Sequence, residues 1–259
     1  MFAHRAAGVA PPTQQHGAAR LDLAMRALRR DKKDDLPAKK RAADGDVLRD
    51  MVCSVTGEDL RGYRDRALLA IGMAGAFRRS ELVAITISRV SQDARGLLIR
   101  VPSSKTDQEG KGQVVAIPDR ERLAPVRQYR AWLDIAGIED DAVFRKLTPQ
   151  GRLTDKAMSA QSVALVVKAA AKAARYDDSD FSGHSLRAGF LTEAGRQNAN
   201  LFKMKEHNRH ASIDMVAEYV RDHERFKGHA GDGFLEISCV LEGCCYCEHP
   251  LFSFQVIHP

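Results

Sequence analysis

Apolar residues recur along most of this chain at the spacing of amphipathic helices. Leucine, isoleucine, valine and methionine return every three or four positions, which places them on one face of a helix. Helices are therefore predicted over residues 15–30, from 46 onward, from 63 onward, and over 79–84, 124–136, 159–175 and 212–221. The segment SGHSLRAGFLTEAGRQ predicts a further helix that starts at Ser182 or Ser185, because serine side chains cap helix starts.

A short stretch of strand pattern interrupts the helices. Residues 97–101 and 113–117 are apolar runs with β-branched side chains, and the polar sequence SSKTDQEGKG separates them. Two such runs joined by a turn-rich loop predict a β-hairpin. The predicted fold class is therefore mainly α with a small antiparallel β-sheet (α+β).

Composition and charge narrow the classes of partner. The chain has 259 residues, enough for one sizeable core, and a net charge of +6, which suits a polyanion such as nucleic acid. No apolar run approaches the roughly 18 residues of a membrane span, and the start MFAHRAAGVAPPTQQ lacks the apolar stretch of a secretory signal. We expect a cytoplasmic protein with no membrane partner and no small-molecule substrate.

Two segments in the first half carry side chains suited to a phosphodiester. In AGAFRRSEL, the Arg78 guanidinium can bind two phosphate oxygens at once, and Glu81 can orient it. A weak surface ion pair between the two is the alternative. In SSKTDQEGKG, Lys105 can reach a leaving oxygen and donate a proton, or it is a solvated loop lysine.

Three segments in the second half add to this set. His184 and Arg187 in GHSLRAG are three residues apart, hence on one helix face, near a helix start where an anion is favoured. A plain capping segment is the alternative. His207 and His210 in HNRHAS have the same spacing, but no third ligand follows, so no metal site is predicted. Tyr219 in SIDMVAEYVRD lies beside the apolar face of the last helix and is either a nucleophile or a core tyrosine.

Taken in order, AGAFRRSEL, SKTDQEGKG, HSLR and RHASIDMVAEY resemble the catalytic domain of the tyrosine recombinases, the phage integrase family, over about residues 46–235. The family pattern is an arginine, a hairpin lysine, a His-x-x-Arg pair, a histidine and a tyrosine. The resemblance assigns these to Arg78, Lys105, His184, Arg187, His210 and Tyr219. It gives Glu81 a supporting role and leaves Arg79 facing DNA or solvent.

The resemblance implies a site-specific DNA recombinase. Tyr219 would attack a DNA phosphorus, forming a 3′-phosphotyrosyl bond and freeing a 5′-hydroxyl. The two arginines and His210 would hold the non-bridging oxygens. Lys105 would protonate the leaving 5′-oxygen, and His184 would assist proton transfer at the tyrosine. The cationic clamp and the covalent bond make metal and ATP unnecessary, so no cofactor is expected. The implied partner is double-stranded DNA, bound by a homotetramer.

Both ends of the chain depart from the family pattern. Residues 1–45 resemble only the last helix and linker of the family's N-terminal core-binding domain, so fewer phosphate contacts and impaired activity are expected. Residues 236–259 form an atypical apolar tail whose cysteines lack the paired CxxC spacing of a zinc ribbon. Two alternatives stay open: type IB topoisomerase-like strand cleavage, and a non-catalytic DNA-binding remnant.

Overall fold

The computed structural model describes residues 18–31, 40–102, 112–209 and 212–224. The chain divides into two compact units, residues 1–41 and 42–259. The described part of the first unit is the helix α2 (Ala18–Asp31), which carries an ion pair of 2.7 Å between Asp22 and Arg26. The helix predicted over residues 15–30 is thereby confirmed within the described residues.

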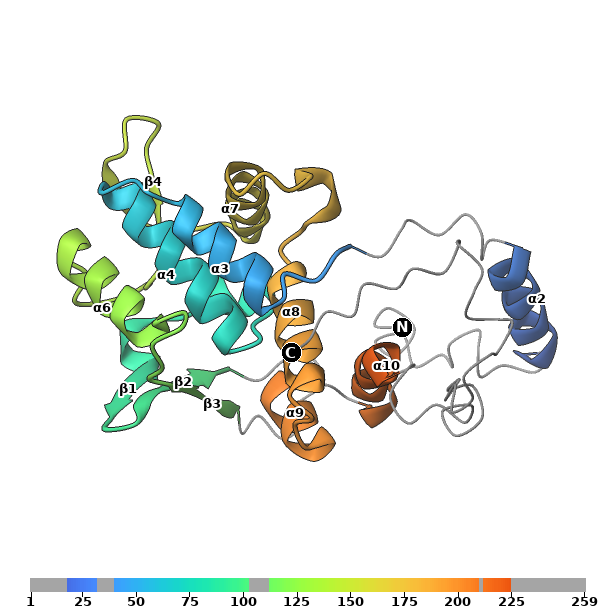
Figure 1. Ribbon diagram of the computed structural model, residues 1–259. Coiled ribbons are helices and arrows are strands. Elements are labelled where there is room, and N and C mark those ends of the chain that lie inside the picture. Colours follow the sequence, from blue (N-terminus) through green and yellow to red (C-terminus); the bar gives the residue numbers. More distant parts are fainter. Residues whose placement is uncertain (1–17, 32–39, 103–111, 210–211, 225–259) are drawn as a thin grey trace, which may run out of the picture. The chain divides into compact units, whose positions relative to one another are not determined.

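The second unit is mainly helical (Figure 1). Its elements in chain order are α3 (Gly45–Ser54), α4 (Leu60–Ala74), α5 (Arg79–Val83), η2 (Ile87–Arg89), β1 (Val90–Asp93), β2 (Gly96–Val101), β3 (Gln113–Pro118), α6 (Pro125–Ala136), β4 (Arg145–Leu147), β5 (Leu153–Ala157), α7 (Ala160–Ala173), η3 (Asp178–Asp180), α8 (Ser185–Arg196), α9 (Leu201–Asn208) and α10 (Ile213–Glu224). Each helix predicted in this part of the chain is confirmed, with ends shifted by a few residues.

The sequence patterns missed α9 and three short strands. Of the apolar residues in α9, Met204 is buried while Phe202 is exposed, so no apolar stripe reveals this helix. The strands β1, β4 and β5 have 4, 3 and 5 residues, too few for a clear alternation of buried and exposed positions. One small sheet was predicted, whereas the described residues form a three-stranded sheet β1-β2-β3 and a two-stranded sheet β4-β5.

The predicted hairpin is confirmed as β2 and β3, which pair antiparallel from Gly96↔Pro118 to Val101↔Gln113. Leu97 and Ile99 are buried, as are their partners on β3, while Arg100 is exposed. This alternation turns one face of the sheet toward the core. The loop between the strands carries Lys105, which lies outside the described residues.

Helix α4 runs through the centre of the unit and packs against α6 on one side and α8 on the other (Figure 1). Trp132 of α6 is fully buried, and its indole Nε1 donates to the carbonyl of Val143 at 2.8 Å. The α4 helix ends in a tight turn at Gly75. A Cβ at Gly75 would lie 2.1 Å from the Phe77 ring, so this position requires glycine. The turn leads directly into α5.

Helix α8 links the main core to the last helix. It contacts α4 and α3, and its Gly189 lies so close to the backbone that a Cβ there would meet the Ala43 carbonyl at 1.8 Å. On its other side, Leu191 packs with Met204 of α9 and Val216 of α10 in a second, smaller cluster. Because both clusters include residues of α8, this helix positions α9 and α10 against the main core. No helix within the described ranges has the length and apolar character needed to cross a lipid bilayer.

Candidate active site

Arg78 is held at the entry to α5 by Glu81. The Arg78 residue is the N-cap of this helix, and its backbone N–H donates to Glu81 Oε2 at 2.9 Å. The Arg78 guanidinium bonds the other carboxylate oxygen, Oε1. The Arg78 side chain is 40% exposed while that of Glu81 is 10% exposed. The carboxylate therefore orients a guanidinium that remains accessible to a ligand.

Arg187 occupies the first turn of α8 and is 1% exposed. Its Nη1 donates to the Ala76 carbonyl at 2.8 Å, and its Nη2 donates to the Asn208 carbonyl. Ala76 belongs to the turn before Arg78, and Asn208 ends α9. One buried side chain therefore connects three segments that are far apart in sequence.

Arg209 is a member of this cluster that the sequence patterns did not identify. It follows α9 with φ 54° and ψ 40°, and its side chain is 6% exposed. Its Nη2 donates to Glu81 Oε2 at 2.8 Å, and its carbonyl accepts a bond of 3.3 Å from Arg78 Nη2. The available signal was an arginine within HNRHAS, and nothing in that string indicated that it is buried.

The cluster brings three guanidiniums around one carboxylate. Burial raises the pKa of Glu81, but the Arg209 charge and hydrogen bonds from Arg78 outweigh burial and lower it overall. Burial, together with the charges of Arg78 and Arg209, lowers the pKa of Arg187 to about 9. Both shifts reflect an excess of positive charge in a poorly solvated place. An anion such as a phosphate would complement this excess.

Tyr219, on helix α10, lies near the arginine cluster. Its ring packs against the small cluster that contains Leu191, Met204 and Val216, and it is half-buried. The charge of Tyr219 is among those that favour the protonated form of Arg187, so the two groups are within electrostatic reach of each other. The structure therefore brings together Arg78, Glu81, Arg187 and Tyr219, whereas Lys105 and His210 lie outside the described residues.

His184 and Arg187 have different surroundings, although they are three residues apart. His184 is the N-cap of α8 and is exposed, whereas Arg187 is buried. The helix starts at Ser185, as predicted, but the expected serine cap is wrong, since the Ser185 hydroxyl accepts instead from the Ser182 N–H at 3.0 Å. The histidine side chain is therefore open to solvent, whereas that of Arg187 is enclosed by protein.

The contacts of the His207 ring are to other parts of the protein. Its Nε2 lies 2.8 Å from the Ala74 carbonyl, which can only accept, so this nitrogen carries the proton. Its ring stacks on Phe190 with centroids 4.5 Å apart. Among the described residues, no three histidine, cysteine, aspartate or glutamate side chains gather closely enough to hold a metal.

The burial of His207 predicts a pH dependence of stability. Burial, together with the charges of Arg209 and Arg187, lowers its pKa below the ordinary 6.5. The unfolded chain therefore takes up a proton near pH 6.5 that the folded chain does not. The free energy of unfolding should fall as the pH drops through this value. Urea unfolding at pH values about one unit above and one unit below measures the change, and His207→Asn should flatten it. Equal slopes for the two proteins would contradict the assignment.

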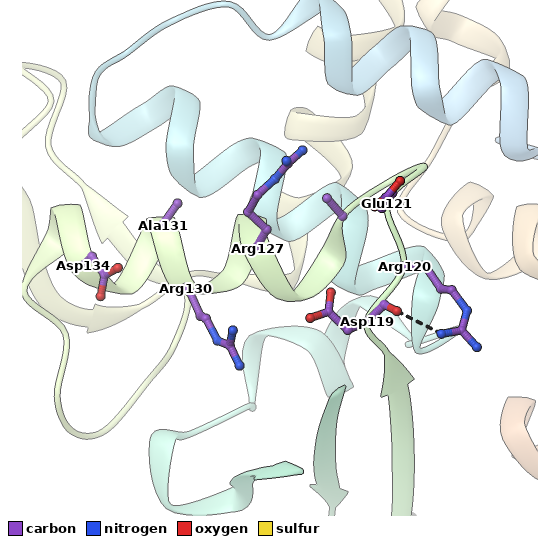
Figure 2. A pocket seen from close by; sticks show the side chains of 8 residues that line it. Asp119, Arg120, Glu121, Arg127, Arg130, Ala131 and Asp134 are labelled. Atoms are coloured by element: carbon purple, nitrogen blue, oxygen red, sulfur yellow. Dashed lines mark hydrogen bonds between the residues drawn. The ribbon is translucent and has the colours of Figure 1, made fainter. Parts of the chain in front are cut away.

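The surface hollow over α6 has a different character (Figure 2). Acidic and basic side chains alternate around it, from Asp119, Arg120, Glu121, Arg127, Arg130 and Asp134. Arg130 is already bonded to Gln92 at 2.9 Å, and Arg120 bonds the Asp119 carbonyl at 3.0 Å. The carboxylates offset the arginines, and none of the predicted catalytic residues that the structure describes lines this hollow, so it is not the candidate active site.

The second unit is thus a mainly helical domain with small antiparallel sheets, in which a cluster of arginines lies within electrostatic reach of Tyr219. The chain belongs to the phage integrase family, whose model matches residues 46–225. The family resemblance of the sequence motifs is thereby confirmed.

A curated relative and several solved structures agree with this family. The chain is 35% identical over 175 residues to the integrase/recombinase xerD homolog of Selenomonas ruminantium, covering 67% of this chain and 51% of that protein. The chain thus spans about half the length of this relative. Its fold is similar to that of XerH recombinase bound to a palindromic difH substrate, with a TM-score of 0.58, 16% identity, and coverage of 72% of this chain and 51% of that one. For XerA recombinase the TM-score is 0.55 at 16% identity, covering 73% and 64%. These likenesses confirm the predicted fold.

Proposed function

We propose that this protein is a site-specific DNA recombinase that cleaves and rejoins double-stranded DNA through a 3′-phosphotyrosyl intermediate on Tyr219. One observation carries the proposal: the buried guanidinium of Arg187 is bonded to the turn that leads into Arg78, and it lies within electrostatic reach of that tyrosine. Guanidinium groups bind the oxygens of a phosphodiester in pairs and stabilise the charge that develops on it during attack.

The proposed reaction has two steps, cleavage and rejoining. Tyr219 attacks the phosphorus, the bond from phosphorus to the 5′-oxygen breaks, and that oxygen leaves with a proton from Lys105. His184 assists removal of the phenolic proton, and His210 donates a hydrogen bond to the same phosphate. Rejoining reverses these events with a 5′-hydroxyl as nucleophile. The chemistry needs no metal and no ATP, since the covalent bond retains the energy of the phosphodiester.

The positions of the flanking elements support the proposed role of Lys105. The strands β2 and β3 pair up to Val101 and Gln113 on either side of its loop. Val114 and Ala116 of β3 also share a hollow with Phe190 of α8 and His207 of α9. The hairpin thus lies beside the two helices that carry or adjoin the arginine cluster.

The proposed partner is double-stranded DNA, and the proposed assembly on it is a homotetramer. In support, the solved relatives include XerH recombinase with its difH substrate and a lambda integrase dimer bound to a core site. The family match over residues 46–225 supports a catalytic domain over about 46–235. We further propose that residues 1–45 contain the last helix and the linker of a core-binding domain, and that residues 236–259 form an atypical tail.

The proposed function can be tested without knowing the DNA target. Nicked duplexes of randomised sequence are incubated with the protein, and the nick lets a short oligonucleotide diffuse away after cleavage, which traps the covalent product. Adducts are recovered under denaturing conditions, sequenced and digested to locate the modified residue. We expect one related set of sequences, with DNA attached to Tyr219.

The alternatives give different results in the same experiment. Adducts on Tyr219 without sequence enrichment, combined with relaxation of supercoiled plasmid, would favour topoisomerase-like cleavage. DNA binding without any adduct over the whole pool would identify a non-catalytic DNA-binding protein.

A further inference from the structure

Arg209 occupies a backbone position that disfavours most residues. It ends α9 in the left-handed region, with φ 54°, where a side chain with a Cβ costs about 1–2 kcal/mol relative to glycine. An arginine in this place therefore needs compensating contacts. The side chain provides them, because it is 6% exposed and bonded on several sides.

Its four terminal N–H groups are matched by four acceptors. Nη1 donates to the carbonyls of Gly75 at 3.1 Å and His207 at 2.6 Å. Nη2 donates to the carbonyl of Ala76 at 2.9 Å and to Glu81 Oε2 at 2.8 Å. A guanidinium has five N–H donors. The remaining one, on Nε, is buried and meets no acceptor among the described residues. Arg209 thus has no terminal donor left for a phosphate.

Two of these acceptors, the Ala76 carbonyl and the Glu81 carboxylate, also bind one of the two proposed phosphate-binding arginines. The Ala76 carbonyl accepts from both Arg209 and Arg187, the latter at 2.8 Å. The Glu81 carboxylate binds Arg78 through Oε1 and Arg209 through Oε2. Arg209 also places its guanidinium 5.1 Å from the centre of the Phe77 ring. It therefore contacts each residue from Gly75 to Arg78: the carbonyls of Gly75 and Ala76, the Phe77 ring, and the Arg78 guanidinium, which donates to the Arg209 carbonyl.

We infer that Arg209 is a positioning residue that fixes the turn 75–77 and the Glu81 carboxylate, and thereby sets Arg78 and Arg187 at the distance that one phosphate requires. This inference rests on the proposed function. The charge of Arg209 adds to the attraction for an anion, but its contacts are all to the protein. Its loss should therefore affect the rate of strand cleavage more than the binding of DNA.

The test compares Arg209→Gly and Arg209→Lys with wild type on one captured nicked duplex. Glycine removes the side chain and suits the left-handed backbone, so the fold should survive. We expect the single-turnover rate of adduct formation to fall about a hundredfold, as for a misplacement of roughly 1 Å, with duplex binding within about threefold of wild type. Lysine keeps the charge but cannot reach four acceptors, so the cleavage rate of Arg209→Lys should lie between those of wild type and Arg209→Gly.

The pH profile of cleavage separates positioning from a loss of general stability. Among the described residues, the charged groups facing Glu81 are Arg78 before α5, Arg187 on α8 and Arg209 after α9. Removing Arg209 takes away a cation that lowers the pKa of Glu81, so the acid limb of the rate profile should move to higher pH.

A matched control is available in Arg145→Gly. Arg145 is likewise a buried arginine, bonded to the Asp140 carbonyl at 2.8 Å, the Ala142 carbonyl at 3.2 Å and the Asp140 carboxylate at 2.7 Å, and it lies on β4. The control should lower the melting temperature without moving the acid limb. Unchanged rates in both Arg209 variants would overturn the inference. So would equal losses of binding and rate, which would indicate a direct phosphate contact. Absence of adduct from the wild type would instead refute the proposed function, and the positioning role with it.

Discussion

Replacing Tyr219 by phenylalanine is expected to abolish the covalent protein–DNA adduct while leaving the fold intact. The change removes one oxygen, which is the proposed nucleophile, and keeps the ring that packs with Leu191, Met204 and Val216. Since only the hydroxyl of a half-buried side chain is removed, the loss of folding free energy should not exceed about 0.5–1.5 kcal/mol. Denaturing gels of trapped nicked duplex measure the adduct, and thermal unfolding checks the fold.

Tyr176→Phe is the matched control for this prediction. It makes the same chemical change at a hydroxyl that donates to Asp50 at 2.7 Å, in contact with the α3 helix rather than with the arginine cluster. The control should form adduct at the wild-type rate. Wild-type adduct yield from Tyr219→Phe, with DNA attached to another residue such as Tyr246, would refute the assignment of the nucleophile.

The second large effect is expected at Arg187, where lysine should lower the cleavage rate about 100- to 1,000-fold. Lysine keeps the positive charge but replaces a planar fork by a single ammonium. Its three donors all leave one nitrogen and cannot span the two carbonyls of Ala76 and Asn208 that the separate Nη1 and Nη2 atoms of arginine reach, so the turn before Arg78 loses one of its anchors. The rate is measured in single-turnover cleavage of captured duplex, with protein in excess.

Stability must be separated from chemistry in this experiment, because Arg187 is 1% exposed. Leaving a buried carbonyl without its donor costs about 1–3 kcal/mol, so a lower melting temperature is expected as well. Arg145→Lys provides the comparison, since it perturbs a buried, carbonyl-bonded arginine on β4. A loss of cleavage in Arg187→Lys no greater than in Arg145→Lys would mean that Arg187 serves the fold alone.

One carboxylate, that of Glu81, interacts with three guanidiniums in the arginine cluster. Glu81 bonds Arg78 and Arg209 directly, and its charge also favours the protonated form of Arg187. A second carboxylate would reduce the positive charge of the cluster and weaken its attraction for an anion. A cluster with none would place like charges together in a poorly solvated site, which is costly. The observed balance holds the arginines in place while leaving the site positively charged.

Sequence patterns predicted most of the helices because their apolar repeats are long. The helices over 63 onward, 124–136 and 159–175 each carry several buried residues at helical spacing, and each was found. The hairpin of β2 and β3 was found because Leu97, Ile99 and Val101 alternate with more exposed positions. Helix α9 and the strands β1, β4 and β5 were missed because their short, mostly polar sequences leave no such pattern.

The residues of the candidate site likewise fall into those that the sequence identified and those that it did not. Arg78, Glu81, Arg187 and Tyr219 were identified from short motifs in the correct order, and the structure brings these four together. Lys105 and His210 stay predictions. His184 and Arg187 were expected on one face, yet one is exposed and the other buried, because the helix begins only after His184.

The sequence by itself determined the helical class, the hairpin and the family. Periodicity and the order of motifs can be read along the chain without knowing which residues are in contact. It could not determine that Arg209 belongs to the site. That role depends on α9 ending in a left-handed residue, and on the turn at Gly75 presenting two carbonyls to the same guanidinium. These groups are separated by more than a hundred residues, and only the packing of α8 and α9 against α4 brings them within hydrogen-bonding distance.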